Sequence, residues 1–157
     1  MRILKTAKFK PAKVSMLIFI MLPLLVFETA TPNDIIFDKK QLVLNGKEYL
    51  LEIARSTKQR RHGLMFREHL DNQQGMLFIY PRSGDHRIWM KNTLIPLTVI
   101  WLDKNERIIG MEKLSPCASD PCPSYGVSKP SKYIIELNGG SHGLKPGHRI
   151  KGLIQLE

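Results

Sequence analysis

The run Trp89-Met90-Lys91-Asn92-Thr93 holds the densest chemistry in the chain, with an aromatic ring, an amine, an amide and a hydroxyl within five residues. If the run is extended, alternation places Trp89, Lys91 and Thr93 on one face and Met90 and Asn92 on the other. One interpretation is structural, with Trp89 in the core, Lys91 in solvent and Asn92 capping a turn. The other places Lys91 and Asn92 at the mouth of a pocket with an aromatic floor, where they could hold an anionic or amide ligand.

A second set of charged residues, Glu52, Arg60, Arg61 and Arg67, offers an anion-binding alternative. Arg60 and Arg67 share a face if their segment is helical. Their guanidinium groups would suit a carboxylate or a phosphate. Alternatively, one of these arginines pairs with Glu52 on the preceding strand.

Together the two sets predict a site for a small polar or anionic ligand. Its predicted ligand-binding residues are Trp89, Lys91, Asn92, Thr93, Arg60, Arg67 and Glu52.

Residues for catalysis or metal binding follow no recognisable motif. The serines lie outside any Gly-x-Ser-x-Gly elbow, the histidines are scattered, and the methionines lack the close spacing of a Cu(I) site. We therefore expect a non-catalytic binding or accessory domain without a metal or cofactor. Two alternatives stay open. One is a cell-envelope enzyme, a hydrolase or lyase on wall or polysaccharide material with Lys91 or Glu136 as base. The other is a protein–protein interaction module.

The two cysteines, Cys117 and Cys122, stand in a proline-rich segment. Two ligands do not complete a tetrahedral zinc site, and a redox pair usually has the tighter Cys-x-x-Cys spacing. In an oxidising compartment the pair most simply forms a local disulfide. Its short ring is worth only about 2 kcal/mol in the chain-entropy model, so the bond would shape the loop more than hold the fold.

The first thirty residues have the pattern of an export segment. Basic residues from Arg2 to Lys13 precede an apolar run at residues 14–27. This order is typical of a secretory signal and unusual for a buried helix. The run is shorter than the roughly 20 residues that a membrane-spanning helix needs. We expect residues 1–30 to be a signal peptide, cleaved near Ala30, or an anchor in the inner membrane. We expect residues 31–157 to be one exported domain in the periplasm or cell envelope.

The charge balance argues against a nucleic-acid partner. The whole chain carries a formal net charge of +10, and without residues 1–30 it falls to +6. The remaining basic residues are scattered, without an aromatic platform on which bases could stack. We expect a monomer that contacts a membrane only through residues 14–27, and only if the leader stays uncleaved.

Strand and turn signals dominate the rest of the chain. Asn45-Gly46 between two apolar runs predicts a hairpin with a type I′ turn. Ser56 and Gln59 form a capping box that predicts a helix from Thr57 to about Phe66. Further strands are expected at residues 75–80, 86–90, 97–102, 107–114, 132–137 and 149–156, with a turn at 81–85 and a long ordered loop at 115–131. These elements predict a mainly β (α+β) fold, a compact antiparallel, barrel-like sheet of seven or eight short strands with one short helix.

Four stretches together resemble a known family. They are Gly63-Leu64-Met65-Phe66-Arg67, Gly75-Met76-Leu77-Phe78, Trp89 to Thr93 with Ile95-Pro96-Leu97, and Pro116-Cys117 to Cys122-Pro123. With Tyr133, Glu136 and the glycines at 140, 143 and 147, the chain from about Leu50 to Glu157 resembles domain of unknown function 192, also called uncharacterised protein family 0127. The resemblance implies a small β-rich single domain, often behind an export signal, with no established activity. The family usually has Ile-Pro-Leu-Asp where this chain has Thr98, so an acid/base role is not expected there.

Overall fold

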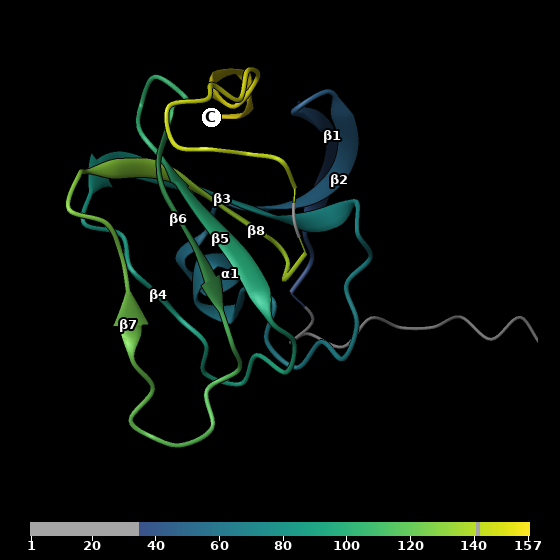
Figure 1. Ribbon diagram of the computed structural model, residues 1–157, viewed down its shortest axis with the longest axis vertical. Helices are drawn as coiled ribbons and strands as arrows, with labels where there is room; N and C mark the ends of the chain where they lie inside the picture. The colour runs from purple at the N-terminus through teal and green to yellow at the C-terminus, as the bar shows by residue number, and fades with distance from the viewer. Residues whose placement is uncertain (1–34, 141) are drawn as a thin grey trace, which may run out of the picture. The chain divides into compact units, whose positions relative to one another are not determined.

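The structure is a computed structural model that describes residues 35–140 and 142–157 (Figure 1). Six strands form one sheet in the order β1-β2-β3-β8-β5-β6, and β4 pairs separately with β7. The strands are β1 (Asp38–Leu44), β2 (Lys47–Ala54), β3 (Gln74–Gly84), β4 (Ile88–Trp89), β5 (Leu97–Leu102), β6 (Ile108–Leu114), β7 (Ser124–Tyr125) and β8 (Ser131–Asn138); the helices are α1 (Thr57–His62) and the short 3-10 helix η1 (Ile154–Leu156). The fold is mainly β, as predicted. The sheet does not close into a barrel, because β1 and β6 are free edges of the sheet.

The hairpin and the helix start confirm the local sequence signals. Asn45 and Gly46 both have positive φ, 50° and 76°, as the predicted turn requires. At the start of α1 the Ser56 hydroxyl accepts the Gln59 N–H at 3.1 Å, and the Gln59 side chain accepts the Ser56 N–H at 2.9 Å. The helix is shorter than predicted and stops at His62, because Gly63 adopts a φ of +53°.

The pairing of β2 with β3 is parallel, so the expectation of a wholly antiparallel sheet is wrong at this position. The connection between these strands carries α1 and a long loop. It returns the chain to the starting end of the sheet, and β3 therefore runs in the same direction as β2. The other pairings of the six-stranded sheet are antiparallel.

Two predicted boundaries differ from the structure in the middle of the chain. β3 continues through the expected turn at residues 81–85, and its register with β8 shifts between Ile79 and Gly84. This irregular stretch accommodates Pro81, which has no N–H for regular pairing. The strand expected at residues 86–90 is only two residues long.

The strand expected at residues 149–156 does not form. Arg149 makes an isolated bridge to Arg107, and the chain then turns into η1. The cause is Glu106, whose Oε1 accepts the N–H groups of Gly152, Leu153 and Ile154 at 3.0, 2.8 and 3.0 Å. Three consecutive N–H groups that converge on one oxygen cannot extend as a strand.

Apolar side chains cover both faces of the sheet. One face, which includes Tyr133 and Ile135, packs under the C-terminal segment through Ile150 and Leu153. The other face packs against the loop after α1 and against β4 (Figure 1), and its buried residues are Ala54, Leu64, Leu70, Met76, Phe78, Ile88, Met90, Leu97, Val99, Trp101, Leu114 and Ile134. All six residues of β5 are buried, as predicted for a strand covered on both faces. The second face holds the candidate site.

Within the described residues, no helix is both long enough and apolar enough to cross a bilayer. The predicted leader at residues 1–30, including the apolar run at 14–27, lies outside the described residues.

Candidate functional site

The candidate site centres on Glu136, an acid in the apolar strand β8. Its register partners are Met76 on β3 and Val99 on β5, so its side chain lies on the face covered by α1 and its following loop. The residue is only 4% exposed. It borders a small cavity of about 20 Å³, roughly the room for one water molecule. The other residues that line the cavity are Arg60, Arg61, His62, Gly63, Leu64, Met65, Phe78, Ile88, Trp89 and Thr93.

Burial determines the protonation state of Glu136. Desolvation raises its pKa to about 8, because the apolar surroundings disfavour the charged carboxylate. The one cation in its eight-residue strand, Lys132, is already held by the Glu157 carboxylate and the Pro81 carbonyl oxygen, each at 3.1 Å, and the nearest neighbours on the same face are Ile134 and Asn138. At neutral pH the carboxyl is therefore mainly protonated and can donate a hydrogen bond from its O–H.

The backbone at Gly63 forms the cover of this acid. A Cβ atom at this position would lie 3.4 Å from Cζ of Phe78 and 3.9 Å from Oε2 of Glu136. The positive φ of 53° is also a conformation that favours glycine. Because α1 ends early, the backbone at Gly63, which carries no side chain, lies directly over the Glu136 carboxyl group.

Two loops beside the cavity are held in an uncommon backbone conformation. Phe66 and Asn92 both have positive φ, 63° and 55°. A bulky residue such as phenylalanine rarely adopts this region, and such strain is concentrated at functional sites. The Phe66 N–H donates to the carbonyl oxygen of Asn92 at 2.8 Å, so the loop after α1 and the turn after β4 are fixed to each other.

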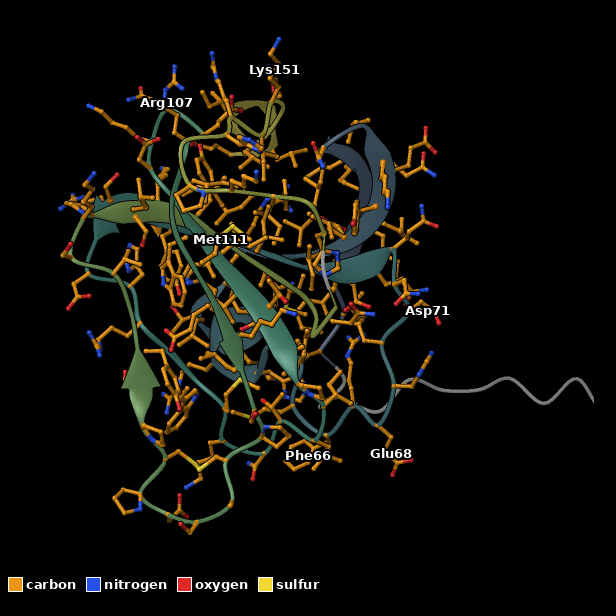
Figure 2. All side chains as sticks on the ribbon, viewed as in Figure 1. Phe66, Glu68, Asp71, Arg107, Met111 and Lys151 are labelled. Carbon is orange, nitrogen blue, oxygen red and sulfur yellow. A yellow bond between two sulfur atoms is a disulfide. The ribbon has the colours of Figure 1, made fainter. Side chains whose placement is uncertain are left out.

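The same two loops and the end of β4 expose large apolar side chains at or next to residues that line the cavity. Phe66, Trp89 and Leu94 are 63%, 47% and 53% exposed, and Phe66 projects from the molecule in Figure 2. The interpretation that placed Trp89 in the core is wrong. The strand ends at Trp89, and Met90 takes the buried position instead.

Arg60 lines the cavity with its guanidinium group already engaged. It donates to the carbonyl oxygens of Arg55 and Ile79, the latter at 3.2 Å, and lies 5.0 Å from the centre of the Tyr80 ring. Tyr80 in turn stacks on His86 at 3.6 Å between ring centres. Burial raises the pKa of Tyr80 to about 12, so its hydroxyl stays neutral.

Arg67 pairs with Glu52, the arrangement that the sequence offered as the alternative to an anion clamp. Its two terminal nitrogens donate to the two carboxylate oxygens at 3.1 and 2.5 Å. Lys39 adds a longer contact of 3.9 Å to the same carboxylate. The fork-to-fork geometry is the strong form of such a pair.

The disulfide loop approaches the rim through Lys91. Cys117 and Cys122 form a disulfide with a Cα–Cα distance of 5.8 Å, the yellow bond in the loop between β6 and β7 in Figure 2. Within that ring, Asp120 accepts the Lys91 ammonium at 3.3 Å, and the ammonium lies 5.9 Å from the Trp89 ring centre.

The seven predicted site residues therefore fall into three places. Arg60, Trp89 and Thr93 line the Glu136 cavity. Lys91 and Asn92 lie beside it in the turn after β4, and Glu52 and Arg67 form their own pair. From the sequence, Glu136 was named among the residues of the family resemblance and as a base in an enzyme alternative, but not as a ligand-binding residue. A stronger signal was available, because this acid interrupts the apolar run Tyr133 to Leu137.

Metal ligands do not gather in the part of the chain that the structure describes. No group of three or more His, Cys, Asp or Glu side chains there is placed to hold a metal ion. The side chains that line the cavity and can form hydrogen bonds are the Glu136 carboxyl, the Thr93 hydroxyl, the His62 imidazole and the guanidinium groups of Arg60 and Arg61. This set suits hydrogen bonding to a small polar group.

These features define a class: a small α+β domain with an open six-stranded sheet and a buried acid beneath the exit of its helix. The chain belongs to the DUF192 family, described as Uncharacterized ACR, whose model matches residues 28–152. This confirms the resemblance found in the sequence. No curated protein matches the chain.

Two solved bacterial structures are similar to this chain. One is a Sinorhizobium meliloti 1021 protein described as a candidate transcription regulator, at 28% identity and a TM-score of 0.68, covering 76% of this chain and 98% of its own. The other is a protein of unknown function from Novosphingobium aromaticivorans DSM 12444, at 25% identity and a TM-score of 0.61, covering 74% of this chain and 85% of its own.

Proposed function

We propose that this domain is a non-catalytic binding module that takes the polar end of a small ligand into the Glu136 cavity. The observation that carries the proposal is a buried carboxyl group that borders a small cavity lined by both apolar and polar side chains. In its neutral form it donates one hydrogen bond, which fits a carbonyl, carboxylate or phosphoryl oxygen. The family has no described activity from which a function could be transferred.

The cavity admits only one or two atoms of a ligand, so the rest of the ligand must lie on the rim. Trp89 lines the cavity, and the exposed Phe66 and Leu94 follow the lining residues Met65 and Thr93 in the chain, which supports an apolar surface there. Aromatic and aliphatic side chains around a few placed polar groups are the usual composition of a small-molecule site. The supported ligand therefore has a ring or apolar body that carries one hydrogen-bond acceptor.

Benzoate, benzamide and phenyl phosphate test this proposal, with benzylamine as the matched ligand whose ammonium only donates. Binding is measured by Trp89 fluorescence, since Trp101 is fully buried. We expect at least one acceptor ligand to bind near millimolar strength, about −4 kcal/mol, and benzylamine to bind more weakly.

Two substitutions at Glu136 test separately the roles of its hydrogen-bond donor and of its ionisation in binding. Glu136→Gln keeps an N–H donor and should make binding independent of pH, whereas the wild type should lose affinity above about pH 8. Glu136→Leu removes the donor and should weaken binding about five- to tenfold. Equal affinity of Glu136→Leu and the wild type for every acceptor ligand would contradict the proposal.

A second candidate is an envelope enzyme in which Glu136 is a general acid. A pKa of about 8 suits an acid that donates a proton near neutral pH. Incubation with peptidoglycan and envelope polysaccharides, followed by assay of new reducing ends, tests it. Product release that Glu136→Gln abolishes would replace the binding proposal with this one. Equal release by both proteins would reject the enzyme.

The candidate transcription regulator does not supply the function that we propose. In the described residues the α-helical structure is six residues long. DNA-reading helices lie along the major groove and present several side chains to base edges. A helix of this length, capped at Ser56 and followed by the cavity cover, does not offer that surface.

We also propose that residues 1–30 direct export and that residues 31–157 act as one domain in the periplasm or cell envelope. The basic-then-apolar leader and the local disulfide support this location. Cell fractionation and intact mass of the native protein test it. A cytosolic protein with both thiols reduced would refute export.

A further inference from the structure

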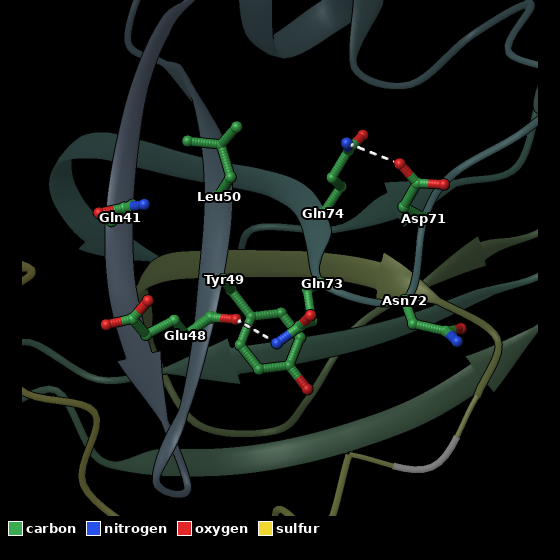
Figure 3. Close-up of a pocket in the computed structure, with 8 residues that line it drawn as sticks. All are labelled: Gln41, Glu48, Tyr49, Leu50, Asp71, Asn72, Gln73 and Gln74. Atoms are coloured by element: carbon green, nitrogen blue, oxygen red, sulfur yellow. Dashed lines mark hydrogen bonds between the residues drawn. The ribbon is translucent and has the colours of Figure 1, made fainter.

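A second hollow lies at the end of the sheet where β2 and β3 start, away from the Glu136 cavity. It consists of two adjoining parts of about 460 and 640 Å³ that share Tyr49, Asn72 and Gln73. Figure 3 shows the first part, which β1, β2 and the segment before β3 enclose. We call the combined hollow the amide groove. Its further lining residues are Gln41, Lys47, Glu48, Leu50, Asp71, Gln74, Asn138, Gly140 and His142.

One wall of the amide groove is a row of side chains that the sheet register aligns across three strands. Gln41 is the partner of Leu50, and Leu50 is the partner of Gln74. Register partners on neighbouring strands point to the same face, so these side chains form one row across β1, β2 and β3. Two primary amides thus flank a half-exposed leucine, a flat polar surface with a small apolar centre.

Hydrogen bonds hold the other amides in defined orientations. Gln73 donates from Nε2 to the carbonyl oxygen of Glu48 at 3.1 Å, and Gln74 donates to Asp71 at 2.8 Å (Figure 3). Asn138 donates to Oδ1 of Asn72 at 2.6 Å. Each bond uses one end of an amide and fixes where the opposite end points. This leaves the Gln73 Oε1 as an acceptor and the Asn72 Nδ2 as a donor on oriented side chains.

A buried pair stabilises the base of the groove. The Tyr49 hydroxyl lies 2.9 Å from Nδ1 of His142, and Nε2 of His142 lies 3.0 Å from the Asn138 carbonyl oxygen. A carbonyl only accepts, so Nε2 carries the proton and Nδ1 accepts from the tyrosine. This arrangement holds the backbone of Asn138 in place beside Asn72.

We propose that the amide groove binds a neutral oligosaccharide. Amides donate and accept at once, as hydroxyl groups do, and five of them line the two parts of the groove with one cation and two acids. A peptide strand could not pair between β2 and the segment before β3, because the Leu50 N–H already donates to the Gln73 carbonyl oxygen at 2.8 Å. The volume matches that of a ligand larger than one sugar ring.

The test uses cellohexaose, maltohexaose and hexa-N-acetylchitohexaose with the full ¹⁵N-labelled chain. A hexagalacturonate and hexaglycine serve as charged and peptide comparisons. We expect at least one neutral hexasaccharide to bind at about 1 mM or tighter and to shift the side-chain NH₂ signals of Asn72 and Gln73. The proposal is overturned if no neutral hexasaccharide binds, or if the charged or peptide probe binds more tightly.

Substitutions locate the site and separate it from the Glu136 cavity. Asn72→Ala and Gln41→Ala change exposed side chains and should each weaken binding about three- to tenfold. Gln155→Ala, an exposed glutamine next to the C-terminus, is the matched control and should leave affinity unchanged. Glu136→Leu should bind the hexasaccharide as the wild type does, so failure of one proposal does not decide the other. Unchanged binding in both Asn72→Ala and Gln41→Ala would refute this location.

Discussion

Glu52 and Glu136 point from the same face of the sheet in a single row, with Met76 between them, and their surroundings are opposite. The register Glu52–Met76–Glu136 crosses β2, β3 and β8. Glu52 receives a bidentate arginine and a lysine contact. Glu136 is buried, and desolvation raises its pKa. The same residue type thus serves as an ionic anchor at one position and as a neutral donor at the other.

The first prediction concerns the pH dependence of stability. The pKa of Glu136 is about 8 in the folded state against an ordinary 4.5, so the folded protein holds this proton more tightly. Its contribution to the free energy of unfolding is therefore complete at low pH and is lost as pH rises through about 8. Each pKa unit corresponds to about 1.4 kcal/mol, so the loss is a few kcal/mol. Urea unfolding between about pH 5 and 9 measures it.

Glu136→Gln should remove this fall in the free energy of unfolding with rising pH, since the amide does not titrate. The slope of the free energy of unfolding against pH is the quantity compared. Glu112→Gln is the matched control, an exposed acid in the same row on β6. It should leave the wild-type slope intact. Parallel slopes for the wild type and Glu136→Gln would show that Glu136 titrates normally.

The contribution of Glu106 to stability should change with pH in the opposite direction to that of Glu136. Desolvation would raise the pKa of this buried acid, but N–H groups of Ile154 and Leu153 and the Arg149 side chain outweigh it and hold the pKa below its ordinary value. Its contribution to stability is present above about pH 4.5 and lost as pH falls below it.

Glu106→Gln should lower the free energy of unfolding by about 2–3 kcal/mol at neutral pH, because it weakens several charge-assisted hydrogen bonds. Glu68→Gln, at the exposed residue labelled in Figure 2, should change it by less than about 0.5 kcal/mol. Similar losses in the two variants would contradict the role of Glu106. Thermal and urea unfolding at pH 7 give both values.

The Arg67–Glu52 pair should contribute measurably to stability because it is partly buried and bidentate. The side chains are 30% and 14% exposed. We expect Arg67→Ala to cost about 1–2 kcal/mol in urea unfolding, and Arg67→Lys to recover only part of it. Arg61→Ala, at an exposed arginine of the same segment, should have little effect. A double-mutant cycle with Glu52→Gln that gives no coupling would refute the pair.

Gly63→Ala should destabilise the fold through its backbone conformation. An alanine at φ +53° is strained, and its Cβ would contact Phe78 at 3.4 Å. We expect a loss of about 1–2 kcal/mol in thermal unfolding. Gly84→Ala is the control, because its Cβ would meet His86 at the same 3.4 Å without a positive φ. Equal losses in both variants would assign the effect to contact alone.

Removal of the disulfide should cost about 2 kcal/mol, because the ring that it closes is short. The double variant Cys117→Ser with Cys122→Ser is compared with the wild type in the presence and absence of a reductant. Reductant should lower the melting temperature of the wild type alone. A melting temperature of the oxidised wild type equal to that of the double variant would contradict this prediction.

Several local elements could be read from the sequence because their causes are local. Asn45-Gly46 makes its turn by positive φ, and Ser56 with Gln59 makes its capping box within four residues. The buried strand at residues 97–102 follows from an unbroken apolar run. The pairing of Cys117 with Cys122 follows from their short separation.

Other features depended on partners distant in sequence. The C-terminal strand was predicted from residues 149–156 alone, but Glu106 binds three of its N–H groups and folds it into a turn. β3 continued past its predicted turn because β8 supplies partners on both sides of the irregular stretch.

The sequence by itself determined the family, the β-rich class and the residue types around the candidate site, because these follow from composition, local turn chemistry and short motifs. Only the tertiary structure decided which of those residues meet. The crossover through α1 makes β2 and β3 parallel, places Gly63 over Glu136, and brings Arg67 in its loop beside Glu52. The pKa of Glu136 is likewise a tertiary property, since it depends on the desolvation that side chains from distant segments produce.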